Sequence, residues 1–239
     1  MLSVRIIKKA IFLLKNKAWR KGLYYGVGAG IEHLPFLKSL NLDCLVDVGA
    51  NKGQFALVVR GLFSNVKIHS FEPLKEPAKT FNQLFLNDPL CELYNNAIGE
   101  NEGEVKIHVS KKDDSSSLLP ITDCQSDLFP GTEEDYEDSV VVMPLNTALS
   151  SDDVFGSALL KIDVQGFELS VLKGCNEYLN KFQHIYVECS FVELYKGQAL
   201  AYQVIEYLSE KGFDLSGIYN ISNDKQGIPI QADFYFKKS

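Results

Sequence analysis

The sequence predicts an α/β protein with a doubly wound, mostly parallel sheet, and three observations carry this prediction. From residue 43 onward, short apolar segments alternate with segments of helical periodicity. A loop with two glycines, residues 47–53, directly follows the first apolar segment and precedes a helical one. Acidic side chains stand at the ends of several strands, where ligands of open α/β sheets bind.

The chain length and composition are those of one soluble domain. The 239 residues are enough for a well-buried core, and 46% of them are hydrophobic. We divide the chain into an N-terminal helical extension, residues 1–40, and a main domain, residues 41–239.

The alternating part of the pattern runs from residue 44 to residue 211. We expect strands at 44–48, 66–71, 91–95, 158–164 and 185–189, because each is short and apolar. We expect helices at 54–63, 77–87, 167–173 and 199–211. Pro77 suits a first helical turn, and Gly174 and Gly212 suit helix ends. Strands that are separated by helices pair in parallel within one sheet.

The last two strands, 213–219 and 232–236, are connected differently. No helix separates them, only a loop at 222–227, so they should pair antiparallel. The predicted sheet therefore has seven strands, with the last one antiparallel.

Residues 99–150 interrupt the alternation. Two further strands are expected at 104–109 and 139–143, and the stretch between them, 113–138, is rich in Ser, Asp, Glu and Pro. Long stretches without secondary structure inside a compact domain are usually disordered or functional. We predict that residues 110–138 form a flap on the substrate side.

Charge is distributed unevenly along the chain. The formal net charge is −7, yet residues 1–22 carry seven basic side chains and no acidic one. We interpret residues 3–20 as a basic amphipathic helix that packs on its own domain or on a second subunit of a homo-oligomer, with contact to a membrane surface as the alternative. The acidic remainder argues against nucleic acid as a partner and is compatible with a cationic ligand.

The five cysteines are widely spaced and include no CxxC pair, so neither a disulfide framework nor a zinc knuckle is predicted. Reduced thiols suit a cytoplasmic location, which we expect.

The loop after the first strand has the features of a nucleotide-type loop. Gly49 allows a tight turn and Gly53 allows close packing of the helix on the strand. Asn51 tolerates a left-handed backbone where many such loops carry a middle glycine. The amides around Ala50 would receive a ligand carboxylate, and Asp47 could face a cationic amine. A tight turn without a ligand is the alternative.

The next two strand ends supply polar groups of the same kind. Glu72 ends the second strand, where an acid can accept hydrogen bonds from ribose hydroxyls, and Pro73 fixes the exit of the chain. Asn96 and Ala97 follow the third strand and suit an adenine edge, although Asn is also common in turns. These features alone do not distinguish S-adenosylmethionine from NAD.

Two further strand ends carry the candidate catalytic acids. Asp163 stands at the end of the fourth strand, and an acid there is costly unless it is hydrated, paired or functional. Glu188 ends the fifth strand and should face the same crevice. We rank Asp163 before Glu188 as general base, and we assign both to the site. Candidate substrate contacts are Glu188 together with Ser115, Ser116, Gln165 and Tyr195.

Together these residues resemble the FkbM family of S-adenosylmethionine-dependent methyltransferases, from about residue 43 to residue 237. The similarity lies in V-D-V-G-A-N-K-G-Q-F at 46–55, S-F-E-P at 70–73, N-A-I-G at 96–99, L-K-I-D-V-Q-G-F-E at 160–168, V-L-K-G at 171–174 and the acid Glu188. Many members have Glu where Gln165 stands here. The resemblance implies the Rossmann-like fold of class I methyltransferases and S-adenosylmethionine as cofactor.

The resemblance also implies methyl transfer, often to hydroxyl groups of sugars or natural products, by in-line displacement. The alternatives are N- or carboxyl methylation on the same fold, a dinucleotide-dependent oxidoreductase, and a binding domain without catalysis. Asp163 and Glu188 could instead hold a divalent metal. No third ligand is evident in the sequence, so no metal is expected. We expect a small-molecule acceptor.

Overall fold

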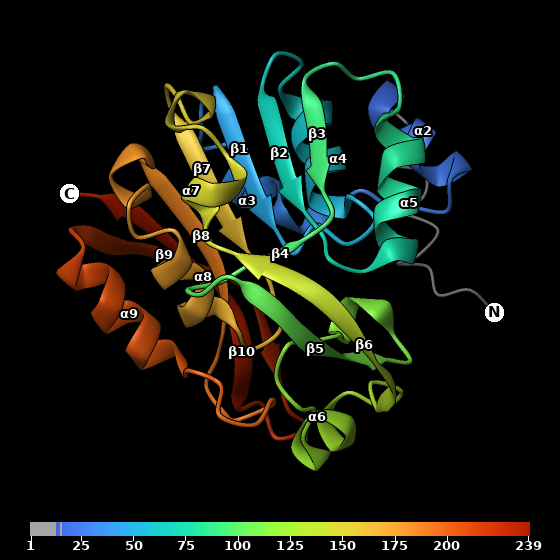
Figure 1. The fold of residues 1–239 in the computed structure, drawn as a ribbon, viewed down its shortest axis with the longest axis vertical. Coiled ribbons are helices and arrows are strands. Elements are labelled where there is room, and N and C mark those ends of the chain that lie inside the picture. Colours follow the sequence, from blue (N-terminus) through green and yellow to red (C-terminus); the bar gives the residue numbers. More distant parts are fainter. Residues whose placement is uncertain (1–12, 15) are drawn as a thin grey trace.

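The computed structural model describes residues 13, 14 and 16–239, and its centre is one seven-stranded sheet (Figure 1). The strands lie in the order β3 (Cys91–Tyr94), β2 (Lys67–Phe71), β1 (Cys44–Val48), β7 (Ala158–Ile162), β8 (His184–Ser190), β10 (Pro229–Lys238) and β9 (Phe213–Asn223).

Strand β10 is antiparallel to both of its neighbours, and β3, β2, β1, β7 and β8 pair in parallel. The predicted fold class is thereby confirmed, including the antiparallel last strand.

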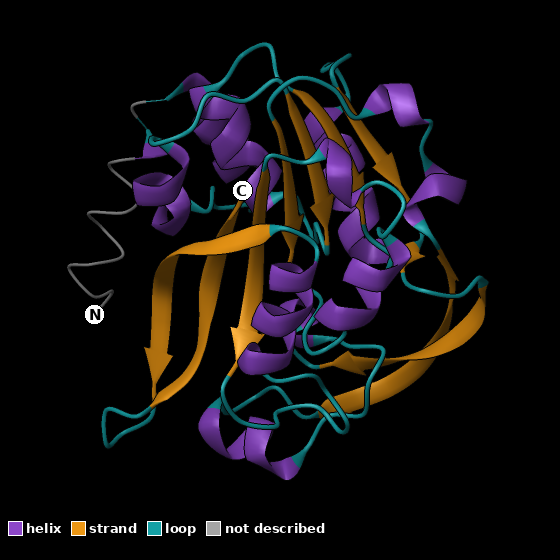
Figure 2. Ribbon diagram, turned by 90° about the vertical axis from the view of Figure 1, so that its left-hand side faces the viewer, coloured by secondary structure: helices purple, strands orange, loops and turns teal. Residues whose placement is uncertain are grey.

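Alternating side chains divide the core between the two faces of the sheet. In β1, Cys44, Val46 and Val48 face one hydrophobic cluster, while Leu45 belongs to the other. The first cluster includes side chains of α7 (Leu145–Ala148), α8 (Glu168–Gly174) and α9 (Ala201–Glu210). The second includes side chains of α2 (Lys17–Tyr24), α3 (Leu34–Leu37), α4 (Gln54–Leu62) and α5 (Lys75–Phe85). Helices therefore cover both faces (Figure 2), as a doubly wound sheet requires.

The N-terminal extension is part of this core where it is described. Most of the predicted helix at 3–20 lies outside the described residues. Its last part differs from the prediction, because Asn16 has an extended backbone and its Oδ1 accepts a hydrogen bond of 2.9 Å from the Ala18 amide, so that α2 begins at Lys17. Further along, Phe36 is fully buried and its ring stacks on Tyr186 at 4.1 Å.

A second, smaller sheet lies beyond the carboxyl ends of β1, β2 and β7 (Figure 1). It consists of β4 (Ala97–Ile98), β6 (Glu134–Met143) and β5 (Gly103–Ser110). The expectation that 113–138 lacks secondary structure was wrong, since this stretch contains α6 (Asp123–Leu128) and the first half of β6. Thr122 caps α6 and donates a hydrogen bond to the Leu194 carbonyl, which fixes the stretch to the segment after β8.

No helix within the described part of the chain is long and apolar enough to cross a membrane.

Replacing Phe36 with alanine tests whether the extension stabilises the main domain. We expect Phe36→Ala to lower the free energy of unfolding by about 3–5 kcal/mol, because a buried ring leaves a cavity against the sheet. Urea denaturation measures this value. The matched control is Tyr202→Ala, on an exposed face of α9, which should change it by less than about 0.5 kcal/mol. Equal effects of the two variants would contradict the role of the extension.

Candidate active site

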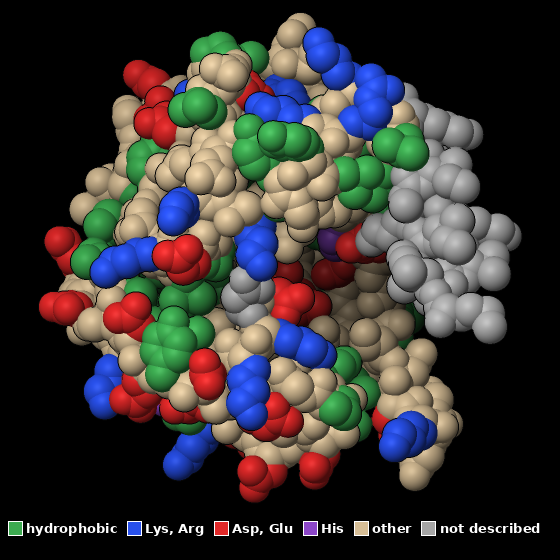
Figure 3. Space-filling model, turned by 90° about the vertical axis from the view of Figure 1, so that its right-hand side faces the viewer, with side chains coloured by type: hydrophobic (Ala, Val, Ile, Leu, Met, Phe, Trp, Pro, Cys, Tyr) green, Lys and Arg blue, Asp and Glu red, His purple; other side chains and the backbone are tan. Residues whose placement is uncertain are grey.

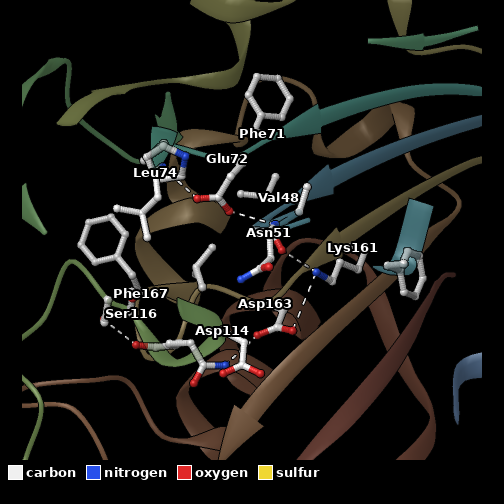
Figure 4. A pocket seen from close by; sticks show the side chains of 18 of the residues that line it. Val48, Asn51, Phe71, Glu72, Leu74, Asp114, Ser116, Lys161, Asp163 and Phe167 are labelled. Atoms are coloured by element: carbon white, nitrogen blue, oxygen red, sulfur yellow. Dashed lines mark hydrogen bonds and ion pairs between the residues drawn. The ribbon is translucent and has the colours of Figure 1, made fainter. Parts of the chain in front are cut away.

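A cavity opens at the carboxyl ends of β1, β2 and β7, and we call it the first cavity (Figure 4). Figure 3 shows a hollow on the surface with acidic side chains in it. The predicted site residues that line the first cavity come from five separate segments. They are Gly49, Ala50, Asn51, Glu72, Pro73, Ala97, Ser116, Asp163 and Gln165.

The loop after β1 adopts the left-handed turns that its sequence suggests. Gly49, Asn51 and Gly53 have φ angles of 78°, 47° and 91°. A Cβ atom at Gly49 would overlap the carbonyl of Asp163, and one at Gly53 would lie 2.8 Å from the ring of Phe81. Gly49 therefore permits the close approach of two loops at the cavity wall. Gly53 does not line the cavity and instead permits packing of α4 on α5.

Glu72 connects the end of β2 to this loop. Its side chain is buried, and its two carboxylate oxygens accept hydrogen bonds of 2.8 Å from the amides of Asn51 and Leu74. Each carboxylate oxygen has a second lone pair, so the group can also accept hydrogen bonds from a ligand.

The wall beyond Glu72 is apolar. Ala97, Ile98, Leu74 and Phe167 line it and offer apolar contacts to a ring. Asn96, which we expected to contact the ligand, is buried, does not line the cavity and donates its side-chain amide to the Ala97 carbonyl. This bond holds the Asn96 side chain against the backbone of the next residue.

A buried lysine that sequence reasoning did not single out lies at the floor of the cavity. Lys161 Nζ is 3.1 Å from Asp47 Oδ1, 2.9 Å from the Gly49 carbonyl and 3.8 Å from Asp163 Oδ2. Burial alone would lower the pKa of Lys161, but the attraction of Asp47 and Asp163 outweighs it and raises this pKa. The lysine therefore stays charged in the core.

Asp47 itself does not face the first cavity. It is fully buried behind the loop, directly opposite Lys161 in the register of β1 and β7. Burial raises the pKa of Asp47, although the positive charge of Lys161 opposes this rise. Asp47 is thus placed to pair with Lys161. Because Lys161 lines the cavity and Asp47 does not, Asp47 affects the cavity through the lysine and does not contact a ligand amine directly.

Gln165 holds the two candidate catalytic acids together. Its Nε2 donates hydrogen bonds of 2.8 Å to Asp163 Oδ1 and to Glu188 Oε2. Tyr195 donates its hydroxyl to Gln165 Oε1 at 2.8 Å, and Gln231 donates to the second oxygen of Glu188 at 3.0 Å. Gln165 does this with a left-handed backbone, at a φ of 56°.

A second cavity lies on the other side of this group. Its walls include residues of the flap and of the strand ends: Lys112, Asp114, Ser115, Gln125, Phe129, Thr132, Asp163, Gln165, Glu188 and Gln231. The two cavities share Asp114, Asp163 and Gln165 as a common wall. Tyr195 lines neither cavity, and its hydrogen bond to Gln165 Oε1 fixes the orientation of the Gln165 side chain.

Glu188 lines the second cavity but not the first. Loss of hydration raises its pKa well above the usual value, and the like charges of Asp163 and Asp233 raise it further. A carboxylate whose pKa is raised toward neutrality is suited to accept a proton.

The N-terminal extension supplies one wall of the first cavity, which the sequence had not assigned. Gly30, Glu32 and His33 line it. His33 Nδ1 is 3.2 Å from the Tyr186 hydroxyl and 3.4 Å from Asp233 Oδ2. The adjacent pair of Glu32 and His33 was the only sequence signal for this wall.

A separate group of metal-ligand side chains lies on the small sheet. In the described part of the chain, His108, Glu134 and Glu137 come close enough to share an ion. None of them lines either cavity, and Glu137 is paired with Lys106 at 2.6 Å. Asp163 and Glu188, the two acids that the sequence offered as alternative metal ligands, instead accept hydrogen bonds from the same Gln165 Nε2.

The seven-stranded sheet with its antiparallel strand β10, the loop after β1 and the acid at the end of β2 are the features expected of a class I methyltransferase. The sequence of residues 47–215 matches the model of the methyltransferase FkbM domain. The chain belongs to this family, which decides between the methyltransferase and the oxidoreductase that the loop alone left open.

Two named proteins are similar over most of their length. The 2-O-methyltransferase NoeI of Sinorhizobium fredii is 26% identical over 170 residues, which cover 69% of this chain and 70% of NoeI. Methyltransferase sdnD of Sordaria araneosa is 28% identical over 210 residues, covering 72% and 74% of the two chains. A solved structure from Streptococcus agalactiae, described as a protein in the NADB-Rossmann superfamily, is 7% identical with a TM-score of 0.50, covering 89% and 70%. It shows the fold alone.

Variants of the Asp47–Lys161 pair test its structural role. We expect Lys161→Met to lower the free energy of unfolding by about 3–5 kcal/mol, because it leaves Asp47 buried without a cation. The double variant Asp47→Leu with Lys161→Met should recover most of this loss, because it leaves no buried charge. Urea denaturation of the wild type, both single variants and the double variant measures the coupling. Simple addition of the two single effects would contradict the pairing.

Proposed function

We propose that the protein transfers a methyl group from S-adenosylmethionine in the first cavity to a hydroxyl group of a small acceptor in the second. The observation that carries this proposal is the common wall of the two cavities at Asp163 and Gln165. A methyl group at that wall can meet an acceptor oxygen in line, and alignment of this kind lowers the barrier by restricting relative motion. The name of NoeI, a 2-O-methyltransferase, supports a hydroxyl acceptor.

The lining of the first cavity fits this cofactor. Glu72 is suited to the ribose hydroxyls, and Pro73, Ala97 and the neighbouring apolar wall are suited to the adenine ring. The amides of Ala50 and Asn51 already donate to the Phe71 carbonyl and to Glu72, so we do not assign the methionyl carboxylate to them. Asp163, with 38% of its side chain exposed, gives the cavity a negative group for a cationic ligand. When bound, S-adenosylmethionine supplies an electrophilic methyl group.

We propose Glu188 as the general base and Asp163 as its partner, which reverses the order of preference from the sequence. Glu188 lines the cavity assigned to the acceptor, and its pKa is raised. Asp163 lies between Lys161 and Gln165, with Oδ2 3.8 Å from the lysine ammonium and Oδ1 accepting a hydrogen bond from the Gln165 amide. The acceptor hydroxyl would pass its proton to Glu188 as its oxygen bonds to the methyl carbon, while the bond from that carbon to sulfur would break and leave S-adenosylhomocysteine.

The charges around the second cavity bear on the acceptor. Asp114, Asp163 and Glu188 would repel a carboxylate or phosphate brought to the common wall. A neutral hydroxyl compound therefore fits better than a carboxyl group or an RNA backbone. Contacts from Ser115, which lines the second cavity, and Ser116, which lines the first, are part of this proposal.

Glu72→Ala tests the cofactor site. We expect it to weaken binding of S-adenosylhomocysteine by about 1.5–3 kcal/mol, because charge-assisted hydrogen bonds to the ribose are lost. Isothermal titration calorimetry measures the affinity. Glu76→Ala removes the same charge from an exposed position on α5 and should leave the affinity unchanged. Unchanged affinity in Glu72→Ala would remove its proposed role.

Glu188→Gln tests the base. We expect kcat to fall by a factor of about 10²–10⁴ while affinity for S-adenosylhomocysteine stays within about twofold, because only proton removal is affected. Exposed Glu206→Gln on α9 is the matched control. Full activity of Glu188→Gln would exclude Glu188 as base.

The pH dependence of Asp163→Asn tests the coupling of the two acids. The base must be ionised, so the rate should fall as the pH falls through the raised pKa of Glu188. Asp163→Asn removes a like charge that raises this pKa, so the acidic limb of the profile should move to lower pH. A profile of kcat against pH in wild type and variant measures the shift. A limb that stays in place would contradict the coupling.

A further inference from the structure

We infer that His33 of the N-terminal extension binds the methionyl carboxylate of S-adenosylmethionine through its Nε2 atom, and that Asp233 of β10 orients the imidazole for this contact. This inference rests on the proposed function and adds a partner for the carboxylate to its cofactor site. Both residues lie outside the segment 47–215 that matches the family model, and neither was among the predicted site residues.

The amino-acid part of the ligand should lie at the end of the first cavity that the extension forms. The wall near Ala97 suits the adenine ring, Glu72 suits the ribose, and Asp163 lies at the common wall, where the methyl group would be transferred. The amino-acid part extends from the sulfur away from the adenosine and therefore faces the remaining wall. That wall includes Gly30, Glu32, His33, Gln54, Phe55 and Lys161.

Two basic side chains of the described residues line the first cavity, Lys161 and His33. The Lys161 ammonium is already directed to Asp47, to the Gly49 carbonyl and to Asp163. An ammonium has three N–H groups, so these three partners use them all. His33 is therefore the basic group that can donate to a ligand carboxylate.

One ring nitrogen of His33 is bound to the protein, and the other is open to the cavity. Nδ1 lies 3.2 Å from the Tyr186 oxygen and 3.4 Å from Asp233 Oδ2. Nε2 has no hydrogen-bond partner among the described residues, and it is not one of their buried polar atoms. It lies beside Gly30, where an added Cβ would be 3.6 Å from it, and Gly30 also lines the cavity. Nε2 is thus placed to meet a ligand.

Asp233 determines which way the imidazole faces. Its side chain is buried, and its Oδ2 accepts hydrogen bonds from the Tyr186 hydroxyl at 3.0 Å and from Asn220 Nδ2 at 2.7 Å. Asn220 donates from a left-handed backbone, at a φ of 47°. Burial alone would raise the pKa of Asp233, but the hydrogen bond and charge of His33, helped by Asn220 and Tyr186, outweigh it and lower this pKa. The ionised carboxylate therefore attracts the Nδ1 side of the ring.

The aromatic neighbours of His33 hold the ring in this orientation. The rings of Phe55 and Tyr186 lie 5.0 Å and 5.6 Å from it, both edge to face. In a protonated imidazole both nitrogens donate, so with Nδ1 turned to Asp233 the Nε2–H is left for the ligand. A carboxylate that accepts from such a donor makes a charge-assisted hydrogen bond, and a ring that is already held loses little freedom on binding.

The acidic groups of the cavity match the other charges of the ligand. S-adenosylmethionine carries a sulfonium and an ammonium besides its carboxylate. Asp163 lies at the common wall, near the proposed position of the sulfonium, and Glu32 is exposed on the same wall as His33. Both ends of the zwitterion can therefore lie near a group of opposite sign.

The test compares two ligands that differ only in this carboxylate, S-adenosylhomocysteine and its decarboxylated analogue. Isothermal titration calorimetry gives both affinities, and we call their ratio the carboxylate preference. His33→Phe keeps a ring against Phe55 and Tyr186 but removes both nitrogens. We expect it to lower the carboxylate preference about 10–100-fold, with the affinity for the analogue within about twofold of wild type, because a charge-assisted hydrogen bond is lost.

The matched control is His108→Phe. The His108 side chain is 14% exposed, against 18% for His33, and it lines neither cavity. This control should keep the carboxylate preference of the wild type. If His33→Phe does not fold, His33→Leu also removes both nitrogens and should give the same loss.

Asp233→Asn tests the positioning role. It should lower the carboxylate preference in the wild-type background, because it weakens the hold on Nδ1. In the His33→Phe background it should not lower the preference further, because Asp233 acts on the ligand through His33. A further loss in the double variant would overturn this role of Asp233.

The outcomes separate this inference from the proposed function. Equal loss of affinity for both ligands in His33→Phe would indicate a merely structural role and overturn the inference, as would an unchanged carboxylate preference. A wild type that binds the two ligands equally would also overturn it and leave the cofactor assignment intact. Absence of S-adenosylhomocysteine binding to the wild type would instead overturn the proposed function.

Discussion

The site depends on one buried cation. Lys161 lies in the register position opposite Asp47, and its ammonium also reaches the Gly49 carbonyl and approaches Asp163. It therefore joins the floor of the sheet to both loops that form the first cavity. The Lys161 ammonium lies over the ring of Phe55, with Nζ 5.7 Å from the ring centre. This ring limits the access of water to the Asp47–Lys161 pair. Because a charge in such a place is stable only with its partners, the lysine fixes where the two loops meet.

A second constraint joins the flap to the catalytic group. The flap is 50 or more residues away in sequence from the strand end that carries Glu188, yet Tyr195 contacts both Ser115 and Gln165. Hydrogen bonds between Thr122 and Leu194 and between Lys196 and Pro120 add to this contact. The two cavities are consequently formed by one connected set of side chains, so the position of an acceptor is coupled to the orientation of the base.

The sequence predicted the fold well because its signals are local. Each strand is a short apolar run, and the antiparallel end follows from a connection that is too short for a helix. The glycines and Asn51 indicated the ligand loop after β1. Glu72 and Asp163 were identified because acids at strand ends are unusual. The features that the sequence did not predict depend on contacts between residues far apart in the chain. Lys161 resembles an ordinary polar residue of a strand in the sequence. Helix α6 lies in a polar segment, and its Leu128 packs on residues far along the chain.

The departure of residue 165 from the family pattern has a physical reason in this network. Its side chain must donate to Asp163 and Glu188 while it accepts from Tyr195. An amide does both at once, whereas a carboxylate has no proton to donate when ionised. A glutamate here would also place a third negative charge beside two acids and raise the pKa of Glu188 further. Gln165 therefore links the two acids without adding a charge that would raise the pKa of Glu188 further.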